Sequence, residues 1–235
     1  DSLGFEGADA NEDSDPLTPQ LRAIDGINPQ DRAFSEAVNA GVTTVVTGPG
    51  SANPIGGQFA AIKTYGVCVD DMVIKAPCAM KMALGENPKT VYNDKNQAPM
   101  TRMGTVSVIR DALFKAVNYR DEWEEYNEDT EENDKPEFDM KLEAMIPVME
   151  GRIPLKAHAH RADDIFTSIR NKLGSDRLKN FHSHFSKIEY TTGGEKKHLT
   201  FEDTVYGPQY EPVMELTYKY GCSPVFICES AGTQA

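Results

Sequence analysis

The sequence predicts an α/β protein in which helices cover a mostly parallel sheet. Two observations favour this class. Near the N-terminus, a helical segment is joined through a single glycine to an apolar, β-branched run. Further along the chain, strand-like and helix-like segments alternate, as in repeated βα units. We count five to six candidate strands, fewer than the eight of a closed barrel.

The first half of the chain supplies the first of these units. Residues 1–28 are polar and rich in turn formers, and Pro29 begins a helix that stops at Gly41. Residues 42–48 follow as a buried, β-branched strand. The Gly/Pro-rich residues 48–58 are predicted as a long loop leading to a helix, with an anion cradle of backbone N–H groups as the alternative. The next predicted elements are strands at 72–75 and 79–84 and helices at 102–126 and 138–149.

The second half continues the same alternation. Its predicted elements are a strand at 153–159, a helix at 162–173 closed by Gly174, a strand at 178–188, a turn at 198–203, a helix at 212–220 and a strand at 225–229. With 235 residues, the chain suffices for one large domain or two small ones.

Composition and charge exclude several classes of partner. The net charge of −13 disfavours phosphate backbones and anionic membranes, so we expect no nucleic-acid or membrane partner. No apolar run approaches the ~20 residues that span a bilayer, and the N-terminus lacks a signal-peptide pattern. The four cysteines show no C-x-x-C spacing, which favours free thiols and a cytoplasmic protein. The acidic run 121–139 is interpreted as a solvated helix end and loop.

Histidine is clustered in one part of the sequence. On a strand, residues i and i+2 face the same side, so each His-x-His pair projects two imidazoles together. If the two strands are neighbours in a parallel sheet, both pairs face one cavity near the carboxyl ends, where α/β active sites collect. All five histidines lie in this part, four of them in the two pairs: His158, His160, His182, His184 and His198.

This clustering predicts a metal site. Two imidazoles at that spacing can bind a Zn²⁺-like ion at ~2.0–2.1 Å, and such an ion lowers the pKa of bound water toward ~7. Glu229 completes the ligand set at the end of the last strand. A lone His-x-His is a weak signal, but two pairs one βα interval apart favour metal binding. We expect a divalent metal, Zn²⁺ first, with Mn²⁺ or Fe²⁺ as alternatives. The candidates for substrate binding are Lys81, Arg161 and Glu189.

Four long stretches before residue 174 carry a family resemblance: DSLGFEGADANEDSDPLTPQLRAIDGINPQDRAF, AGVTTVVTGPGSANPIGGQFAAIKTYG, KMALGENPK and IPLKAHAHRADDI. They resemble the interior of amidohydrolase-superfamily proteins of the imidazolonepropionase-like kind. The resemblance implies a metal-bearing (β/α)₈ TIM barrel, with His158 as a metal ligand and His160 as a neighbouring or substrate-contacting group. The sequence departs from the family in lacking the first-strand His-x-His, the later metal His and the final Asp.

From Ser175 onward the chain resembles a different family. DRLKNFHSHFSKIEYTTGGEKKHLTFED and VFICESAGTQ are similar to the closing part of a xylose-isomerase-like or endonuclease IV-like barrel, which is also a (β/α)₈ metal fold. This resemblance implies metal-site positions for His184, His198 and Glu229, and puts His182 where a relative would carry Asp. We therefore expect an incomplete or hybrid barrel, with residues 1–173 and 174–235 packed as one domain.

The predicted function is that of a metal-dependent hydrolase of amidohydrolase type. Metal-activated water would attack a C–N bond of an amide or cyclic amide in a small-molecule substrate. One alternative is a xylose-isomerase-like or endonuclease IV-like metal enzyme acting on sugars or phosphodiesters. Another is a non-catalytic hybrid barrel whose histidines are remnants. An exposed strand edge of an unclosed sheet would favour a homo-oligomer.

Overall fold

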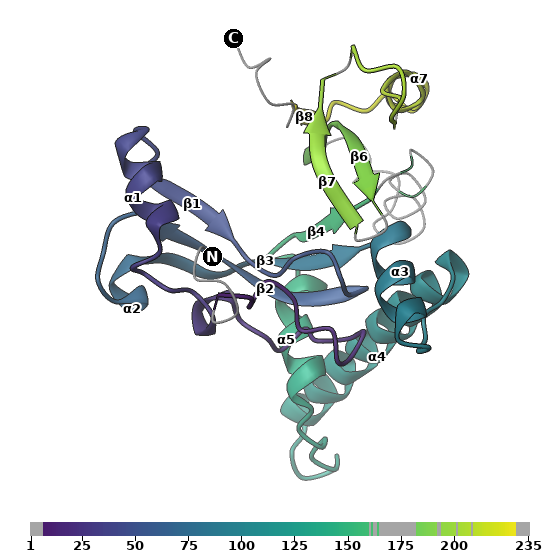
Figure 1. Cartoon of the computed structure of the whole chain (residues 1–235). Coiled ribbons are helices and arrows are strands. Elements are labelled where there is room, and N and C mark those ends of the chain that lie inside the picture. Colours follow the sequence, from purple (N-terminus) through teal and green to yellow (C-terminus); the bar gives the residue numbers. More distant parts are fainter. Residues whose placement is uncertain are drawn as a thin grey trace. The chain divides into compact units, whose positions relative to one another are not determined.

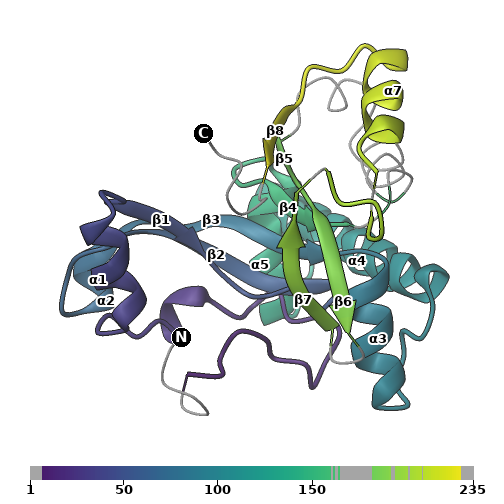
Figure 2. The same ribbon diagram turned by 45° about the horizontal axis from the view of Figure 1, so that its top comes forward.

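The computed structural model describes residues 7–159, 161, 164, 182–191, 194–200, 202–207 and 209–228. The chain divides into two units, Asp1–His158 and Ala159–Ala235, which are taken separately below. The first unit has a mixed α/β fold, and its sheet is curled in a way that is compatible with part of a barrel (Figures 1 and 2). The closed (β/α)₈ barrel and the division at residues 173 and 174 stay predictions.

A four-stranded sheet organises the first unit. The strand order is β1-β2-β3-β4; the pairs β1/β2 and β2/β3 are antiparallel, whereas β3 and β4 are parallel. The sheet therefore differs from the mostly parallel one predicted. Parallel neighbours need a crossover of a dozen or more residues, and only the connection from β3 to β4, which contains three helices, is that long. The strands are β1 (Thr44–Thr47), β2 (Ile55–Lys63), β3 (Val73–Ala83) and β4 (Leu155–His158).

Strand β2 occupies part of the segment that the sequence analysis assigned to a loop. Gly57 has φ 121°, and a Cβ at this position would lie 2.7 Å from the carbonyl oxygen of Leu21. Glycine is therefore needed for the N-terminal segment (residues 7–22) to run beside β2. That segment forms parallel bridges from Leu17 to Ile55 and from Arg22 to Gln58. The predicted buried strand at 42–48 corresponds to β1, but β1 lies at the sheet edge and is largely exposed.

Two helices of the first unit, at residues 102–128 and 140–149, follow residues whose side chains accept from free N–H groups. The hydroxyl of Thr101 accepts from the Gly104 N–H at 3.0 Å, and Asp139 accepts from the N–H groups of Lys141 and Leu142. Both helices that were predicted between residues 102 and 149 are present with small shifts at their ends. The helical elements are η1 (Ala23–Asp25), α1 (Arg32–Asn39), α2 (Val69–Met72), α3 (Glu86–Asp94), α4 (Arg102–Glu128) and α5 (Met140–Met149).

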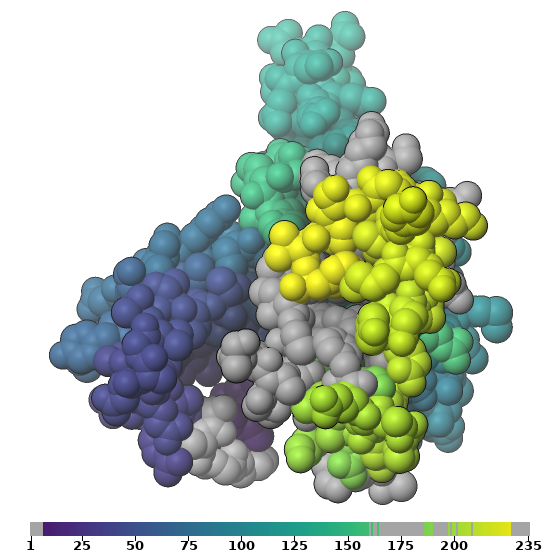
Figure 3. Space-filling view, turned by 90° about the horizontal axis from the view of Figure 1, so that it is seen from above, coloured from purple at the N-terminus to yellow at the C-terminus, as the bar shows by residue number. Residues whose placement is uncertain are grey.

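Helices α4 and α5 form a hairpin on one side of the sheet (Figure 1). Its tip, in teal, projects beyond the rest of the first unit (Figure 3). The acidic run 121–139 covers the end of α4 and the loop before α5, and most of its residues are exposed. This confirms the interpretation of the run as a solvated helix end and loop.

Apolar side chains of β2 and β3 form the buried centre of the first unit. The end of β3 is buried on both faces, since Met80 and Met82 point to one side and Ala79 and Ala83 to the other. At the β1 side of the sheet, a second apolar group consists of Ala60, Ile62 and Met72, with partly buried residues packed against it: Ala23, Ile24, Ile27, Phe34, Val45 and Val73.

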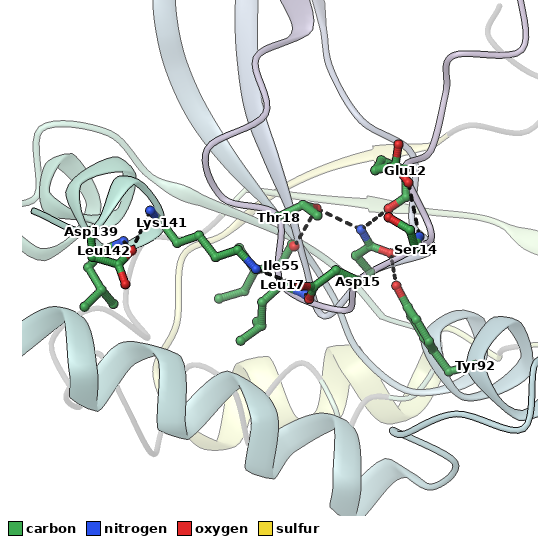
Figure 4. A network of polar contacts seen from close by, with 11 residues as sticks. Glu12, Ser14, Asp15, Leu17, Thr18, Ile55, Tyr92, Asp139, Lys141 and Leu142 are labelled. Atoms are coloured by element: carbon green, nitrogen blue, oxygen red, sulfur yellow. Dashed lines mark hydrogen bonds and ion pairs between the residues drawn. The ribbon is translucent and has the colours of Figure 1, made fainter.

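A buried polar network attaches the N-terminal segment to the sheet (Figure 4). Asn53, only 3% exposed, is its centre. The Asn53 amide donates to the Glu12 carbonyl at 2.6 Å and to the Thr18 hydroxyl at 2.8 Å, and it accepts from the Tyr92 hydroxyl at 2.7 Å. Every polar atom of the Asn53 side chain is thus satisfied, as a buried amide requires.

Two ion pairs connect the N-terminal segment to α5 and to the end of α3. Lys95 Nζ lies 2.6 Å from the Asp13 carboxylate, and Lys141 Nζ lies 2.7 Å from that of Asp15. Burial by itself would raise the pKa of Asp15. Hydrogen bonds from Lys141 and from the Leu17 N–H, with the charge of Lys141, outweigh that effect and hold the pKa below its ordinary value.

We expect Asp15→Asn to lower the free energy of unfolding at pH 7 by less than about 1 kcal/mol, since the ion pair is partly exposed to solvent. A lowered pKa stabilises the folded state above the ordinary carboxyl pKa, and that contribution is lost as the pH falls through the folded pKa. The difference from the parent should therefore disappear near pH 2 in urea titrations. Asp9→Asn, at an exposed neighbouring position, is the control. An equal loss at both pH values would contradict this account.

The described part of the second unit includes two strand pairs and the helix α7. Strands β5 and β8 are parallel, and β6 and β7 are antiparallel. The predicted strand at 178–188 is instead divided at Ser186 between β5 and β6, and the predicted turn at 198–203 begins later because β7 reaches Leu199. The elements are β5 (His182–Phe185), β6 (Lys187–Thr191), β7 (Gly194–Leu199), α7 (Glu211–Lys219) and β8 (Val225–Cys228).

A buried lysine organises the loop after β7. Lys187 is 3% exposed, and its ammonium group donates to the carbonyl oxygen of Asp203. The Asp203 carboxylate accepts from the N–H groups of Tyr206 and Val205, and these bonds lower its pKa.

Among the described residues of the whole chain, no helix is long and apolar enough to cross a membrane.

Candidate functional site

His158 is the last residue of β4, at the carboxyl end of the parallel pair that β4 forms with β3. Its carbonyl oxygen accepts from the Leu84 N–H at 2.8 Å, while the preceding N–H, that of Ala83, donates to the Pro54 carbonyl at 3.1 Å. The end of β3 is thus held between the loop before β2 on one side and His158 on the other. This is the position that the sequence analysis gave to His158, and the carboxyl ends of parallel strands are where α/β active sites collect.

The parallel register brings a predicted substrate-binding residue close to His158. The Cα partner of Ala83 is His158, and that of Lys81 is Lys156. Paired residues of adjacent strands project from the same face, and so do residues two apart along one strand. One face of the sheet therefore carries Lys81, Lys156 and His158. All three residues are partly buried.

An aromatic ring lies on the same face. Phe59 of β2 pairs with Ala79 of β3, and Lys156 Nζ lies 4.8 Å from the centre of the Phe59 ring. Neither Lys156 nor Phe59 was a candidate from the sequence. Lys156 could have been found from the alternation of β4, since it lies two residues before His158. Phe59 could not, because the sequence analysis expected a loop over residues 48–58 leading to a helix, and so no strand at this position.

The Gly/Pro-rich loop before β2 is not an anion cradle at two of its N–H groups. The Gly50 N–H donates to the Ala10 carbonyl at 2.7 Å, and the Ala52 N–H donates to the side-chain oxygen of Asn11 at 3.1 Å. Both donors are therefore used by the N-terminal segment. The loop also packs against the aromatic ring, because a Cβ at Gly48 would lie 2.5 Å from ring atoms of Phe59.

The second His-x-His pair lies on β5, in the second unit. The register of β5 and β8 pairs His182 with Val225 and His184 with Ile227. The sequence analysis had assumed that the strands carrying the two pairs are neighbours in one sheet. Among the described sheets they are not hydrogen-bonded neighbours, because β4 belongs to the four-stranded sheet and β5 pairs with β8. A metal site shared by both pairs stays a prediction. In the described parts of the chain, no group of three His, Cys, Asp or Glu side chains could hold a metal ion.

The remaining candidates have different outcomes. His160 and Glu229 fall outside the described residues. His198 is on β7, paired with Ile188, and Glu189 of β6 lies opposite Lys197 of β7, where opposite charges favour strand pairing. Arg161 is exposed, and it follows His158 by three residues. The structure thus brings together His158 and Lys81 among the predicted site residues.

Two proteins named amidohydrolases are similar to this chain. A solved amidohydrolase from Thermotoga maritima MSB8 is 46% identical, with a TM-score of 0.68 over 72% of this chain and 44% of that one. Amidohydrolase tasK of Hapsidospora irregularis is 28% identical over 94% of this chain and 26% of its own length. An uncharacterized protein of Methanocaldococcus jannaschii is 35% identical over 28% of this chain and 23% of its own. No protein-family model matches.

These likenesses support an amidohydrolase-type family for the chain. The chain spans about a quarter of the length of the two curated relatives and less than half of the solved structure. The alignment with tasK covers 94% of the chain, so it extends past residue 173 into the segment for which the sequence suggested another origin. The xylose-isomerase-like resemblance of residues 174–235 stays a prediction.

Proposed function

We propose that the chain acts as a metal-dependent hydrolase of amidohydrolase type that cleaves a C–N bond in an amide or cyclic amide of a small molecule. The observation that carries the proposal is the place of His158. It ends a strand parallel to β3, beside a partly buried lysine, in a chain 46% identical to a solved amidohydrolase over 72% of its length. A hydrolytic site at the carboxyl end of parallel strands has ample precedent in α/β enzymes.

The residues near His158 suit a divalent metal in part. An imidazole on a strand end, held through its own backbone, is a ligand that Zn²⁺ and related ions prefer, and Mn²⁺ or Fe²⁺ would accept it too. His158 would hold the ion with His160, and His182, His184, His198 and Glu229 are the further ligands proposed from the sequence. When bound, the ion would supply Lewis acidity toward the carbonyl group and toward water.

The protein's own groups would bind and orient the substrate. The face that carries His158 and Lys81 also carries the apolar ring of Phe59, which is 7% exposed and would exclude water from one side of a bound amide. Lys81 would position the substrate from the neighbouring strand. Arg161 and Glu189 are the other substrate-binding residues proposed from the sequence.

Metal content and hydrolysis measured together test the proposal. Protein purified without chelator should contain about one or more equivalents of Zn, Mn or Fe, and it should hydrolyse members of a panel of N-acyl amino acids and cyclic amides. A chelator should abolish hydrolysis and lower the unfolding midpoint, because an ion present at 100 times its Kd stabilises the folded state by about 2.7 kcal/mol. The same chelator saturated with zinc beforehand is the control.

Other outcomes separate the alternatives. Turnover of keto-sugars or abasic DNA by the metal-loaded protein, without amide cleavage, would favour the isomerase-like or endonuclease-like reading. An unfolding midpoint that does not respond to the chelator, with well under one equivalent of metal, would favour the non-catalytic barrel. The tasK alignment over 94% of the chain supports the hydrolase against both. A homo-oligomer and a cytoplasmic location stay predictions.

A further inference from the structure

Strand β1 directs backbone hydrogen-bonding groups away from the sheet at its border (Figure 1). The bond from the Thr64 N–H to the Thr43 carbonyl, 3.2 Å long, fixes which residues bond to β2. In an antiparallel pair, successive residues alternate between bonding to the partner strand and pointing away from it. The odd-numbered residues from 43 to 47 therefore bond to β2. The N–H and C=O groups of Thr44 and Val46 point outward.

The composition of β1 favours pairing with a further strand. Among the described residues, the outward backbone groups of Thr44 and Val46 make no hydrogen bond. The strand reads TVVT and pairs with β2 without a register shift, so it has none of the lysine, proline or bulges that commonly block pairing at a sheet edge. Val46 is also 50% exposed, and Val42, just before the strand, is 44% exposed.

The other border strand of the described sheet is a poorer candidate. Strand β4 contains Lys156, and lysine is a residue that opposes pairing at an edge. Three of the four residues of β4 are partly buried, whereas Thr44 and Val46 of β1 are exposed. The open edge of this sheet is therefore at β1.

A second copy of β1 fits this edge. Antiparallel pairing about a two-fold axis between the two Val45 residues sets Thr44 of each copy opposite Val46 of the other. Each of these pairs exchanges two hydrogen bonds, so every outward N–H and C=O group of both residues gains a partner. Because the axis is perpendicular to the sheet, the two Val46 side chains lie on the same face and approach each other diagonally.

The charges near the edge permit this pairing. Of the β2 residues paired with β1, only Lys63 is charged, and it lies opposite Thr44. In the two-fold arrangement the two Lys63 residues are separated by three strand spacings, about 14 Å. This distance exceeds the Debye length of about 8 Å at physiological ionic strength, so their repulsion is largely screened. The acidic run 121–139 belongs to α4 and the loop before α5, and so does not contribute to the edge.

We propose that the chain forms a two-fold symmetric dimer through β1, in which the two four-stranded sheets join into one continuous sheet. An exposed strand edge was the basis for the predicted homo-oligomer, and β1 is the edge that we assign to it. The dimer does not depend on the hydrolase activity proposed above.

Sedimentation velocity at increasing protein concentration tests for the dimer. We expect a reversible equilibrium with a Kd between roughly 1 µM and 1 mM, because the paired edge is short and the interface small. Val46→Lys places a charge on the edge and diagonal to its own counterpart, so the Kd should rise at least about tenfold. Ile74→Lys is the matched control. Ile74 is 51% exposed on the inner strand β3, and its replacement should change the Kd by less than about twofold.

Introduced cysteines test the register. Thr44 of one copy and Val46 of the other should have Cα atoms about 5.5 Å apart, within the range of a disulfide. The two Val46 residues should be about 7–8 Å apart, which is beyond that range. A mixture of Thr44→Cys and Val46→Cys chains should therefore form a linked dimer under mild oxidation, seen by electrophoresis without reductant. Val46→Cys alone should link no more than the parent, which retains the native cysteines.

Several results would overturn the dimer. A chain that stays monomeric at about 1 mM has no such interface. Equal weakening by Val46→Lys and Ile74→Lys would place the interface elsewhere, and equal linking by Val46→Cys alone would refute the register. Slow hydrogen exchange of the Thr44 and Val46 amides in a monomer would show that another segment of the same chain covers the edge. Circular dichroism checks the fold of each variant, and the cysteine mixture decides if Val46→Lys does not fold.

Discussion

Replacing His158 by alanine is expected to reduce both bound metal and amide hydrolysis by roughly 100-fold or more. Loss of groups that merely orient metal ligands already costs about 10–100-fold, and His158 is proposed as a ligand itself. The side chain is partly buried, and alanine would retain the hydrogen bond that the His158 carbonyl accepts from the Leu84 N–H. The variant should therefore fold and lose function.

Thermal unfolding of the parent and of His158→Ala, each in the presence of a chelator, is the control for this variant. Without metal, His158→Ala and the parent should unfold at nearly the same temperature, whereas only the parent should gain stability when zinc is added. His158→Gln, which keeps a polar side chain, should behave like alanine. Metal analysis by mass spectrometry and initial rates on an N-acyl amino acid are the measurements. Full metal content and activity in His158→Ala would exclude this residue as a ligand.

Replacing Asn53 by alanine is expected to be the most damaging single change to stability that the structure indicates. The Tyr92 hydroxyl, the Thr18 hydroxyl and the Glu12 carbonyl each lose a partner, and an unsatisfied buried polar group costs about 1–3 kcal/mol. Asn53→Ala should therefore lower the free energy of unfolding by about 3–5 kcal/mol and the unfolding midpoint by about 10 °C.

An exposed asparagine makes a matched control for this change. Asn133 also donates its side-chain amide to a backbone carbonyl, that of Glu125, but at the exposed end of α4. Asn133→Ala should cost less than about 0.5 kcal/mol. Tyr92→Phe, which removes one bond of the network, should fall between the two. Urea unfolding followed by circular dichroism gives these values, and a cost for Asn53→Ala no larger than that for Asn133→Ala would show that the network contributes little.

Local sequence signals predicted the helices better than the strand pairing. The capping residues Thr101 and Asp139 mark the starts of α4 and α5 within two residues of the predictions, because a helix start depends on neighbours in sequence. Strand β2 was missed because Gly56 and Gly57 resemble a loop, although contact with the distant Leu21 requires the second of them. The prediction of a mostly parallel sheet was also wrong for β1, β2 and β3, since strand pairing is decided by residues far apart in the chain.

Only the part of the candidate site that lies on a single strand could be predicted from the sequence. The alternation of β4 sufficed to place His158 at a strand end with its side chain on a defined face. The assumption that β4 and β5 are sheet neighbours failed, because neither strand contains a signal for its partner: β4 pairs with β3 and β5 with β8. For the same reason the sequence did not connect Lys156 with Phe59.

The attachment of the N-terminal segment has a consequence for the order of folding. Asp15 meets Lys141 across 126 residues, and Lys95 reaches the Asp13 carbonyl across 82. At a translation rate of about 5–20 residues per second, the first of these partners emerges roughly 6–25 s after its acidic counterpart. The part of the chain that is synthesised early thus completes its contacts late. During that interval the Asp15 carboxylate of a nascent chain stays in contact with solvent, without the lysine that pairs with it in the folded protein.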